Sequence, residues 1–127
     1  MLQPCHHTID LKYCTMGLDE VQDVKDFLEY AVRLMRMTQV TEAQVYQFDT
    51  EPPNNGITGT IILAESLIDI HTYPKEQTAY ISLFSCKPFY VRNLVDYCKW
   101  YFGGELAKVC QVERYRYNAI HNDDRPH

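Results

Sequence analysis

Apolar and polar residues alternate in several short stretches of the chain, which is the pattern of β-strands with one buried face. The first of these stretches runs from His6 to Tyr13 and places Ile9 and Leu11 on one face and Asp10 on the other. The same pattern predicts further strands over residues 41–48, 57–67, 79–85 and 106–117, with residues 68–73 continuing the third strand past a bend.

Two stretches instead repeat apolar residues every three or four positions, as amphipathic helices do. The first begins at Asp19, where Gln22 completes a capping box, and ends near Met37. The second carries Pro88 in its first turn and ends at Gly103. Pro and Gly signals and polar composition predict connections over residues 14–17, 51–56 and 75–77, and a polar tail over residues 118–127.

The order of these elements is β-α-β-β-β-α-β, which predicts a two-layer α/β sandwich. We expect a mainly antiparallel sheet with both helices on one face, built as a single domain of residues 1–127. The other face of the sheet must then be polar or covered. Because Tyr and Phe are abundant in the strands, a second copy of the chain is the expected cover, giving a homodimer.

Composition narrows the range of functions. A formal net charge of −5 gives no basic surface for nucleic acid, and no stretch of 18 apolar residues predicts a membrane span. The N-terminus has no pattern of a secretory signal. Five irregularly spaced cysteines without a CxxC pair favour thiols in the reducing cytoplasm. The neighbouring His6 and His7 point to opposite faces of a strand, so no metal site is expected.

Candidate chemistry gathers at the centre of the chain, where an apolar run over residues 57–64 leads into Glu65 and Ser66. His71 follows five residues after Ser66, and Cys86 lies fifteen further on. A hydrolase nucleophile is disfavoured because the glycines of a G-x-S-x-G turn are missing. Two interpretations stay open: an edge strand that ends in two polar residues, or a peptide bond that cleaves itself.

Self-cleavage would begin with attack of the Ser66 hydroxyl on the carbonyl carbon of Glu65, which converts the peptide bond into an ester. Loss of the α-proton of Ser66 would then expel the Glu65 carboxylate, and the dehydroalanine left behind would hydrolyse to a pyruvoyl group. This chemistry needs a base, for which His71 is the candidate, and a donor to the tetrahedral oxyanion, for which Thr58 is the candidate.

Four short motifs together resemble the prokaryotic S-adenosylmethionine decarboxylase proenzyme family. They are Gly56-Ile57-Thr58-Gly59, Ala64-Glu65-Ser66, Ile70-His71-Thr72-Tyr73-Pro74 and Leu83-Phe84-Ser85-Cys86. The resemblance spans residues 6–116 and also covers the length of the chain and the order of its elements. It implies a dimeric two-layer sandwich whose active sites lie near the protomer interface, and a decarboxylase of polyamine biosynthesis.

The resemblance also implies a role for each candidate residue. The chain would be cleaved between Glu65 and Ser66 into a β chain of residues 1–65 and an α chain of residues 66–127 that begins with the pyruvoyl group. This group forms a Schiff base with the substrate amine and withdraws electrons, as pyridoxal phosphate does. His71 and Thr58 would serve the cleavage, and Cys86 would return a proton to the substrate α-carbon.

Substrate recognition departs from the family pattern. The candidate substrate-binding residues are Asp10, Phe48, Tyr73 and Glu76. The family usually has His after the cleavage-site Ser, Trp before the Pro and Glu after it, whereas this chain has Leu67, Tyr73 and Lys75. Unlike a carboxylate, an ammonium group cannot accept hydrogen bonds from ribose hydroxyls. Three alternatives stay open: decarboxylation of S-adenosylmethionine, decarboxylation of ornithine or arginine, or a catalytically silent regulatory homologue.

Overall fold

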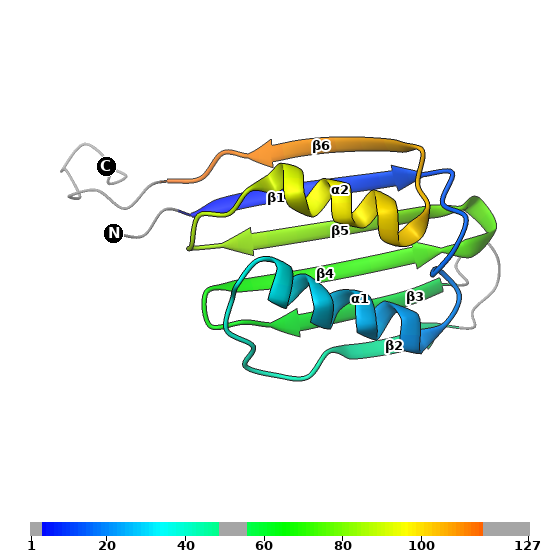
Figure 1. The fold of residues 1–127 in the computed structure, drawn as a ribbon, viewed down its shortest axis with the longest axis horizontal. Helices are drawn as coiled ribbons and strands as arrows, with labels where there is room; N and C mark the ends of the chain where they lie inside the picture. The colour runs from blue at the N-terminus through cyan, green and yellow to red at the C-terminus, as the bar shows by residue number, and fades with distance from the viewer. Residues whose placement is uncertain (1–3, 49–55, 116–127) are drawn as a thin grey trace, which may run out of the picture.

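The computed structural model describes residues 4–48 and 56–115, which form a six-stranded antiparallel sheet with two α-helices on one face (Figure 1). The order of the strands across the sheet is β2-β3-β4-β5-β1-β6. The strands are β1 (Cys5–Lys12), β2 (Gln44–Phe48), β3 (Gly56–Ile62), β4 (Ser66–Tyr73), β5 (Thr78–Ser85) and β6 (Leu106–Val112), and the helices are α1 (Val21–Leu34), α2 (Val91–Phe102) and the 3₁₀ turn η1 (Pro74–Glu76).

The predicted two-layer α/β sandwich is confirmed, but the sheet contains one strand more than expected. The single strand predicted over residues 57–67 is interrupted by a tight turn, so that β3 and β4 pair as an antiparallel hairpin. The turn is closed by a hydrogen bond of 2.9 Å from the Leu63 N–H to the Ser66 carbonyl. The Glu65–Ser66 bond therefore lies at the tip of a hairpin and not inside a strand. We call residues 63–66 the cleavage turn, after the cleavage that the sequence predicts at this bond.

Both helices begin later than the sequence predicted. The capping box is wrong, because the Gln22 amide donates to the Asp26 carboxylate one turn further along (2.8 Å) and no side chain caps α1. Pro88 precedes α2, whose N-cap is Tyr90. The predicted end of α2 is confirmed at Gly103, which takes the left-handed conformation (φ 63°) that glycine adopts without strain.

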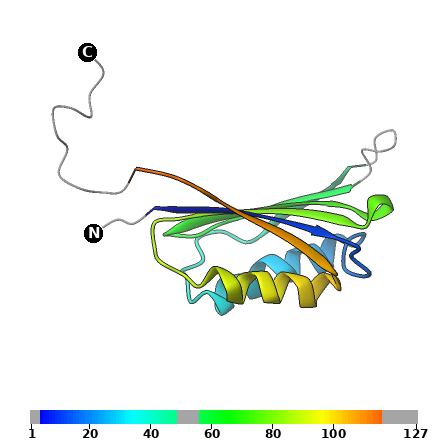
Figure 2. The ribbon, with the colours of Figure 1, turned by 90° about the horizontal axis from the view of Figure 1, so that it is seen from above.

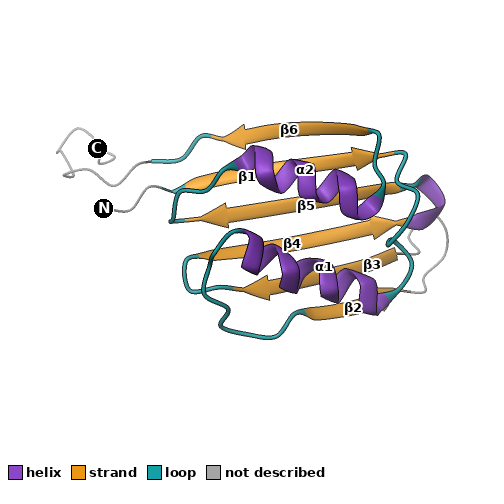
Figure 3. Ribbon diagram, viewed as in Figure 1, coloured by secondary structure: helices purple, strands orange, loops and turns teal. Residues whose placement is uncertain are grey.

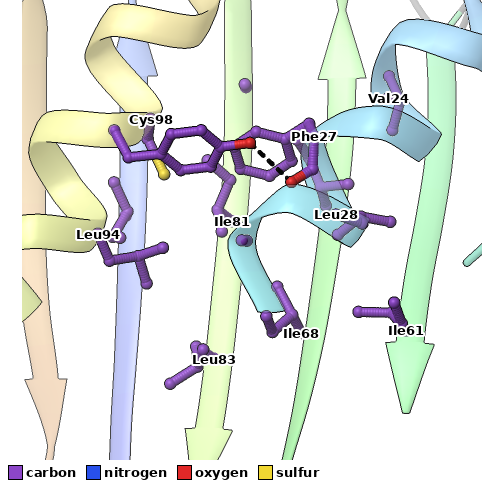
Figure 4. Close-up of a cluster of buried hydrophobic side chains, with 14 of the residues drawn as sticks. Val24, Phe27, Leu28, Ile61, Ile68, Ile81, Leu83, Leu94 and Cys98 are labelled. Atoms are coloured by element: carbon purple, nitrogen blue, oxygen red, sulfur yellow. Dashed lines mark hydrogen bonds between the residues drawn. The ribbon is translucent and has the colours of Figure 1, made fainter. Parts of the chain in front are cut away.

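The hydrophobic core lies between the helices and one face of the sheet (Figure 4). The ring of Phe27 on α1 stacks on Tyr97 of α2 at 5.1 Å, and the Tyr97 hydroxyl donates to the Phe27 carbonyl at 2.8 Å. Below the helices, Ile68 and Ile81 are buried side chains of the sheet. This packing holds the helices against the sheet.

The opposite face of the sheet is covered by no helix or strand of the described residues (Figure 2). We call it the outer face. Along β4, Ser66, Ile68, Ile70 and Thr72 are buried on the helix side, and the residues between them lie on the outer face. The expectation that a second protomer covers the outer face stays a prediction. Within the described segments, neither α-helix is long and apolar enough to cross a bilayer.

Predictions for residues 51–55 and for the chain beyond residue 115 lie outside the described residues. The β3–β4 turn and the loop from β5 to α2 lie at the same end of the sheet (Figure 3). Since β4 and β5 pair from Ser66 opposite Ser85 onward, these two connections are neighbours in space. This end of the sheet carries the candidate site.

Candidate active site

The carbonyl group of Glu65, the one that self-cleavage would attack, is held by a backbone donor. The N–H of Cys86 donates to the Glu65 carbonyl oxygen at 2.9 Å. The structure thus brings together three of the residues that the sequence predicted, namely Glu65, Ser66 and Cys86. It also supplies a donor that stabilises negative charge on the Glu65 oxygen, a role for which the sequence had suggested Thr58.

The side chain of Glu65 is held as well. Its carboxylate accepts a hydrogen bond from the Thr38 N–H (3.1 Å) and lies 4.0 Å from the Lys87 ammonium. On the other side of the turn, the Ala64 N–H donates to the Thr38 carbonyl at 2.9 Å. The segment that follows α1 therefore runs beside the cleavage turn and restricts how its peptide groups can rotate.

The hydroxyl group of Ser66 is almost completely buried and donates to the Sδ atom of Met37 at 2.9 Å. A thioether is a weak acceptor and cannot take up the proton that Ser66 must lose to become a nucleophile. This bond therefore orients the hydroxyl without activating it. Self-cleavage would need a base from another group.

His71 and Thr58, the predicted processing residues, lie together but away from Ser66. The Thr58 Oγ1 and His71 Nδ1 atoms are 2.9 Å apart, and the two residues are register partners on β3 and β4. Five residues along a strand correspond to about 16 Å, and an odd separation places two side chains on opposite faces. Within one protomer, His71 therefore cannot reach the Ser66 hydroxyl.

The candidate substrate-binding residues also lie away from the cleavage turn. Asp10 lies on the outer face opposite Tyr80, which is in turn opposite His71. Phe48 pairs with Gly56 at the far end of the sheet. A Cβ atom added to Gly56 would lie 3.5 Å from the Tyr73 ring, so Tyr73 also lies at this end of the sheet. Glu76 is exposed in η1 beyond β4.

A cavity of about 690 Å³ lies between the end of α1 and the start of α2, and Lys87 in its wall lies 4.0 Å from the Glu65 carboxylate. Its wall includes Phe89 and Leu94, and its polar groups come from Arg36, Lys87 and Asn93. Two cationic side chains make this cavity suitable for a carboxylate. In the part of the chain that the structure describes, no three His, Cys, Asp or Glu side chains gather as a metal site would require.

Three residues around the turn were missed by sequence reasoning, namely Met37, Thr38 and Lys87. Met37 and Thr38 had been placed at the end of the first helix, but α1 ends at Leu34 and the chain then turns toward β3. Lys87 follows Cys86 without any local signal of function. Their contacts depend on how three separate segments meet, so no spacing along the chain reveals them.

Asp69 is a half-exposed carboxylate on the outer face, and burial raises its pKa although the charges of His71 and His6 oppose this change. The folded protein then binds this proton more tightly than the unfolded chain does. The free energy of unfolding should therefore fall as the pH rises from about 3.9, the ordinary pKa of Asp, through the raised value.

Asp69→Asn is accordingly expected to raise the free energy of unfolding at pH 7. It should also remove the part of the decrease in this free energy with rising pH that Asp69 causes. The measurement is denaturant unfolding between pH 4 and pH 8 at one protein concentration. Glu76→Gln, at an exposed carboxylate, is the matched control and should change the stability by less than about 0.5 kcal/mol. Equal stability of Asp69→Asn and the natural chain at pH 7 would contradict the prediction.

The chain is a two-layer sandwich with a Glu-Ser bond at a hairpin tip, next to a cysteine. These features are the ones to compare with proteins of known family. The chain belongs to the S-adenosylmethionine decarboxylase family, whose profile matches residues 5–115. Its fold is similar to the crystal structure of the adenosylmethionine decarboxylase from Aquifex aeolicus VF5. The TM-score is 0.79 at 26% sequence identity, over 95% of this chain and 98% of that one.

Relatives with a curated name are described as S-adenosylmethionine decarboxylase proenzymes. The protein from Hydrogenobaculum sp. (strain Y04AAS1) is 36% identical over 81 residues, which are 63% of this chain and 57% of that protein. The protein from Symbiobacterium thermophilum is 35% identical over 112 residues, which are 86% of this chain and 80% of that protein. The chain matches only about half of the length of several of these relatives.

Proposed function

We propose that this chain is a self-cleaving, pyruvoyl-dependent decarboxylase that acts on S-adenosylmethionine in polyamine biosynthesis. The observation that carries the proposal is the 2.9 Å hydrogen bond from the Cys86 N–H to the Glu65 carbonyl, next to a buried serine at a hairpin tip. The family and the names of the relatives support the same activity. Cys14, Cys86, Cys98 and Cys110 are free thiols, which is consistent with the cytoplasm as its compartment.

Cleavage begins when a base takes the hydroxyl proton of Ser66 and its Oγ bonds to the carbonyl carbon of Glu65. The Glu65 carbonyl oxygen becomes negative in this step, and it already accepts a hydrogen bond from the Cys86 N–H. The C–N bond then breaks, which leaves an ester and a free amine on Ser66. Loss of the Ser66 α-proton releases the Glu65 carboxylate, and hydrolysis of the remaining enamine, after it tautomerises to an imine, releases ammonia and leaves the pyruvoyl group.

The residues around the turn are suited to a pyruvoyl group at position 66. Ser66 lies at the start of β4, and Cys86 follows directly after the neighbouring strand β5. The pyruvoyl carbonyl supplies an electron sink for an amino acid bound through its amine. The Cys86 thiol would give a proton to the substrate α-carbon after CO₂ has left, and the hydrogen bond of its backbone to the turn supports this role. Lys87, the next residue, brings positive charge to within 4.0 Å of the Glu65 carboxylate.

A smaller cationic amino acid such as ornithine or arginine is the second candidate substrate. The observation in its favour is that the family's acidic residue after the Pro is replaced by Lys75, while Asp10 and Asp69 place carboxylates on the outer face. A carboxylate there would pair with a cationic side chain. Phe48 is the register partner of Gly56, and the Tyr73 ring lies near the same glycine, so two aromatic residues share this end of the sheet. Aromatic side chains favour an aromatic base such as adenine, so S-adenosylmethionine is preferred.

The test is CO₂ release from S-adenosylmethionine, ornithine and arginine by one preparation, with denaturing mass spectrometry of the same sample. We expect chains of residues 1–65 and 66–127, the second without a free amino terminus, and the fastest release from S-adenosylmethionine. Faster CO₂ release from ornithine or arginine would show that this amino acid, and not S-adenosylmethionine, is the substrate. A whole chain that releases no CO₂ but alters the rate of a related decarboxylase would establish the silent regulatory homologue instead.

We further propose that the active protein is a homodimer paired through its outer faces. The separation of Ser66 from the Thr58–His71 pair within one protomer supports this, because a second protomer can supply the missing base. The Ser66 side chain would then leave Met37 and turn to the outer face, where the partner's His71 would act on it. The partner's Phe48 and Tyr73 would hold the substrate. Pairing would also cover a sheet face that exposes several aromatic and aliphatic side chains.

Mixing of variants tests this arrangement. His71→Ala alone is expected to remain whole, since no base reaches Ser66. When it is co-expressed with a differently tagged Ser66→Ala chain, the His71→Ala chain should be cleaved, because the Ser66→Ala chain supplies its intact His71. Cleavage is read separately for each tag by mass spectrometry. If the His71→Ala chain is cleaved equally with and without the second chain, the exchange of residues between protomers is wrong.

A further inference from the structure

Cys86 is enclosed by a local hydrogen-bonded loop that Ser85 forms with Lys87. The Ser85 hydroxyl donates to the Lys87 carbonyl at 2.8 Å, and the Lys87 N–H donates to the Ser85 hydroxyl at 2.9 Å. Ser85 is fully buried at the last position of β5. One side chain therefore fixes both the N–H and the carbonyl of the residue two positions ahead.

This loop restricts the orientation of the two peptide groups on either side of Cys86. The regular ladder of β5 ends at Ser85, opposite Ser66, so Cys86 is no longer held by ordinary strand pairing on both sides. Its N–H nevertheless points at the Glu65 carbonyl at 2.9 Å. With Ser85 bonded to Lys87 on the far side of Cys86, the peptide groups on either side of Cys86 cannot rotate independently.

The outer end of the same loop is tied to the cleavage turn. The Lys87 ammonium donates to the Arg36 carbonyl at 2.9 Å and lies 4.0 Å from the Glu65 carboxylate. Lys87 is exposed, so this ion pair is weak by itself. The two bonds of the buried Ser85 hydroxyl are the stronger restraint, since a buried hydroxyl that loses its partners cannot turn to water.

We propose that Ser85 is a positioning residue for self-cleavage, because its hydroxyl holds the Cys86 N–H against the Glu65 carbonyl. The inference rests on the proposed function and adds to it a residue whose hydroxyl bonds to Lys87, whereas the attacking hydroxyl bonds to Met37. An enzyme that loses a whole oxyanion donor slows by about 10²–10³-fold. A donor that is loosened but still present should cost less, and we expect cleavage to slow about tenfold in Ser85→Ala.

Three variants measure this effect. The chains are made by cell-free translation, and the fraction cleaved is followed over time by denaturing mass spectrometry. Ser85→Ala should be cleaved about tenfold more slowly, whereas Ser85→Thr keeps the hydroxyl and should restore most of the rate. Thr78→Ala is the matched control, because Thr78 is a buried hydroxyl at the other end of β5 that also bonds to a carbonyl two residues away. It should cleave within twofold of the natural rate.

Amide hydrogen exchange tests the positioning without cleavage. In the Ser66→Ala background, Ser85→Ala should raise the exchange rate of the Cys86 N–H at least about fivefold, while Thr78→Ala leaves it unchanged. If the natural chain is cleaved and Ser85→Ala is cleaved equally fast, or if Cys86 exchange does not change, the role of Ser85 is wrong and the proposed function stands. A natural chain that is never cleaved overturns the proposed function and the role of Ser85 with it.

Discussion

Ser66→Ala is expected to leave a single chain of 127 residues that releases no CO₂ from any amino acid. The variant lacks the hydroxyl that attacks the Glu65 carbonyl, so neither the ester nor the pyruvoyl group can form. Denaturing mass spectrometry gives the chain length, and CO₂ release gives the activity. Because the buried hydroxyl donates to a thioether, which is a weak acceptor, its removal should cost little stability.

Thr78→Ala is again the control for loss of a buried hydroxyl, and it should be cleaved and active. Two results would contradict the expectation. Cleavage of Ser66→Ala at the same bond would mean that another group attacks, and CO₂ release by the whole chain would mean that the electron sink is not made from Ser66. Circular dichroism of the variant excludes misfolding as the reason for a whole chain.

Cys86→Ala is expected to be cleaved normally but to release CO₂ about 100-fold more slowly. Cleavage uses the backbone N–H of Cys86, which alanine keeps, whereas turnover uses the thiol, which alanine lacks. A general acid contributes about 10²–10⁴-fold to a rate, and the lower end applies because water can replace the proton donor in part. The loss should appear in kcat and leave KM nearly unchanged.

Cys110→Ala removes an exposed thiol from β6 and is the matched control, with no expected effect on either step. A Cys86→Ala chain that remains whole would show that the thiol itself takes part in cleavage. A Cys86→Ala chain with full turnover would transfer the proton-donor role to another group. The separation of two functions between the backbone and the side chain of one residue makes this variant more informative than Cys86→Ser.

The fold was largely predictable because alternation and helical periodicity record which face of each element is buried. The hairpin tip was not, because residues 63–65 contain none of the Gly, Pro or Asn signals that mark turns. Buried positions of β3 and β4 also follow each other as one apolar stretch, so two short strands looked like one long strand. The turn is instead held by contacts with Thr38 and Cys86, which are distant in the sequence.

The candidate site was predictable only in part for a similar reason. Glu65, Ser66 and Cys86 meet because β4 and β5 are neighbours with matching ends. His71 is close to Ser66 in the sequence, yet strand geometry carries it to the opposite face about 16 Å away. Ser85 and Met37 act through hydrogen bonds of their side chains, and no spacing rule predicts which partners such bonds choose.

The position of β1 in the sheet has a consequence for what cleavage would produce. Residues 1–65 contain β1, β2 and β3, and residues 66–127 contain β4, β5 and β6, while β1 lies between β5 and β6. The two pieces are thus interleaved, and neither holds its three strands side by side. They would form an obligate complex whose dissociation is the same event as its unfolding, so the stability of the mature enzyme would depend on its concentration.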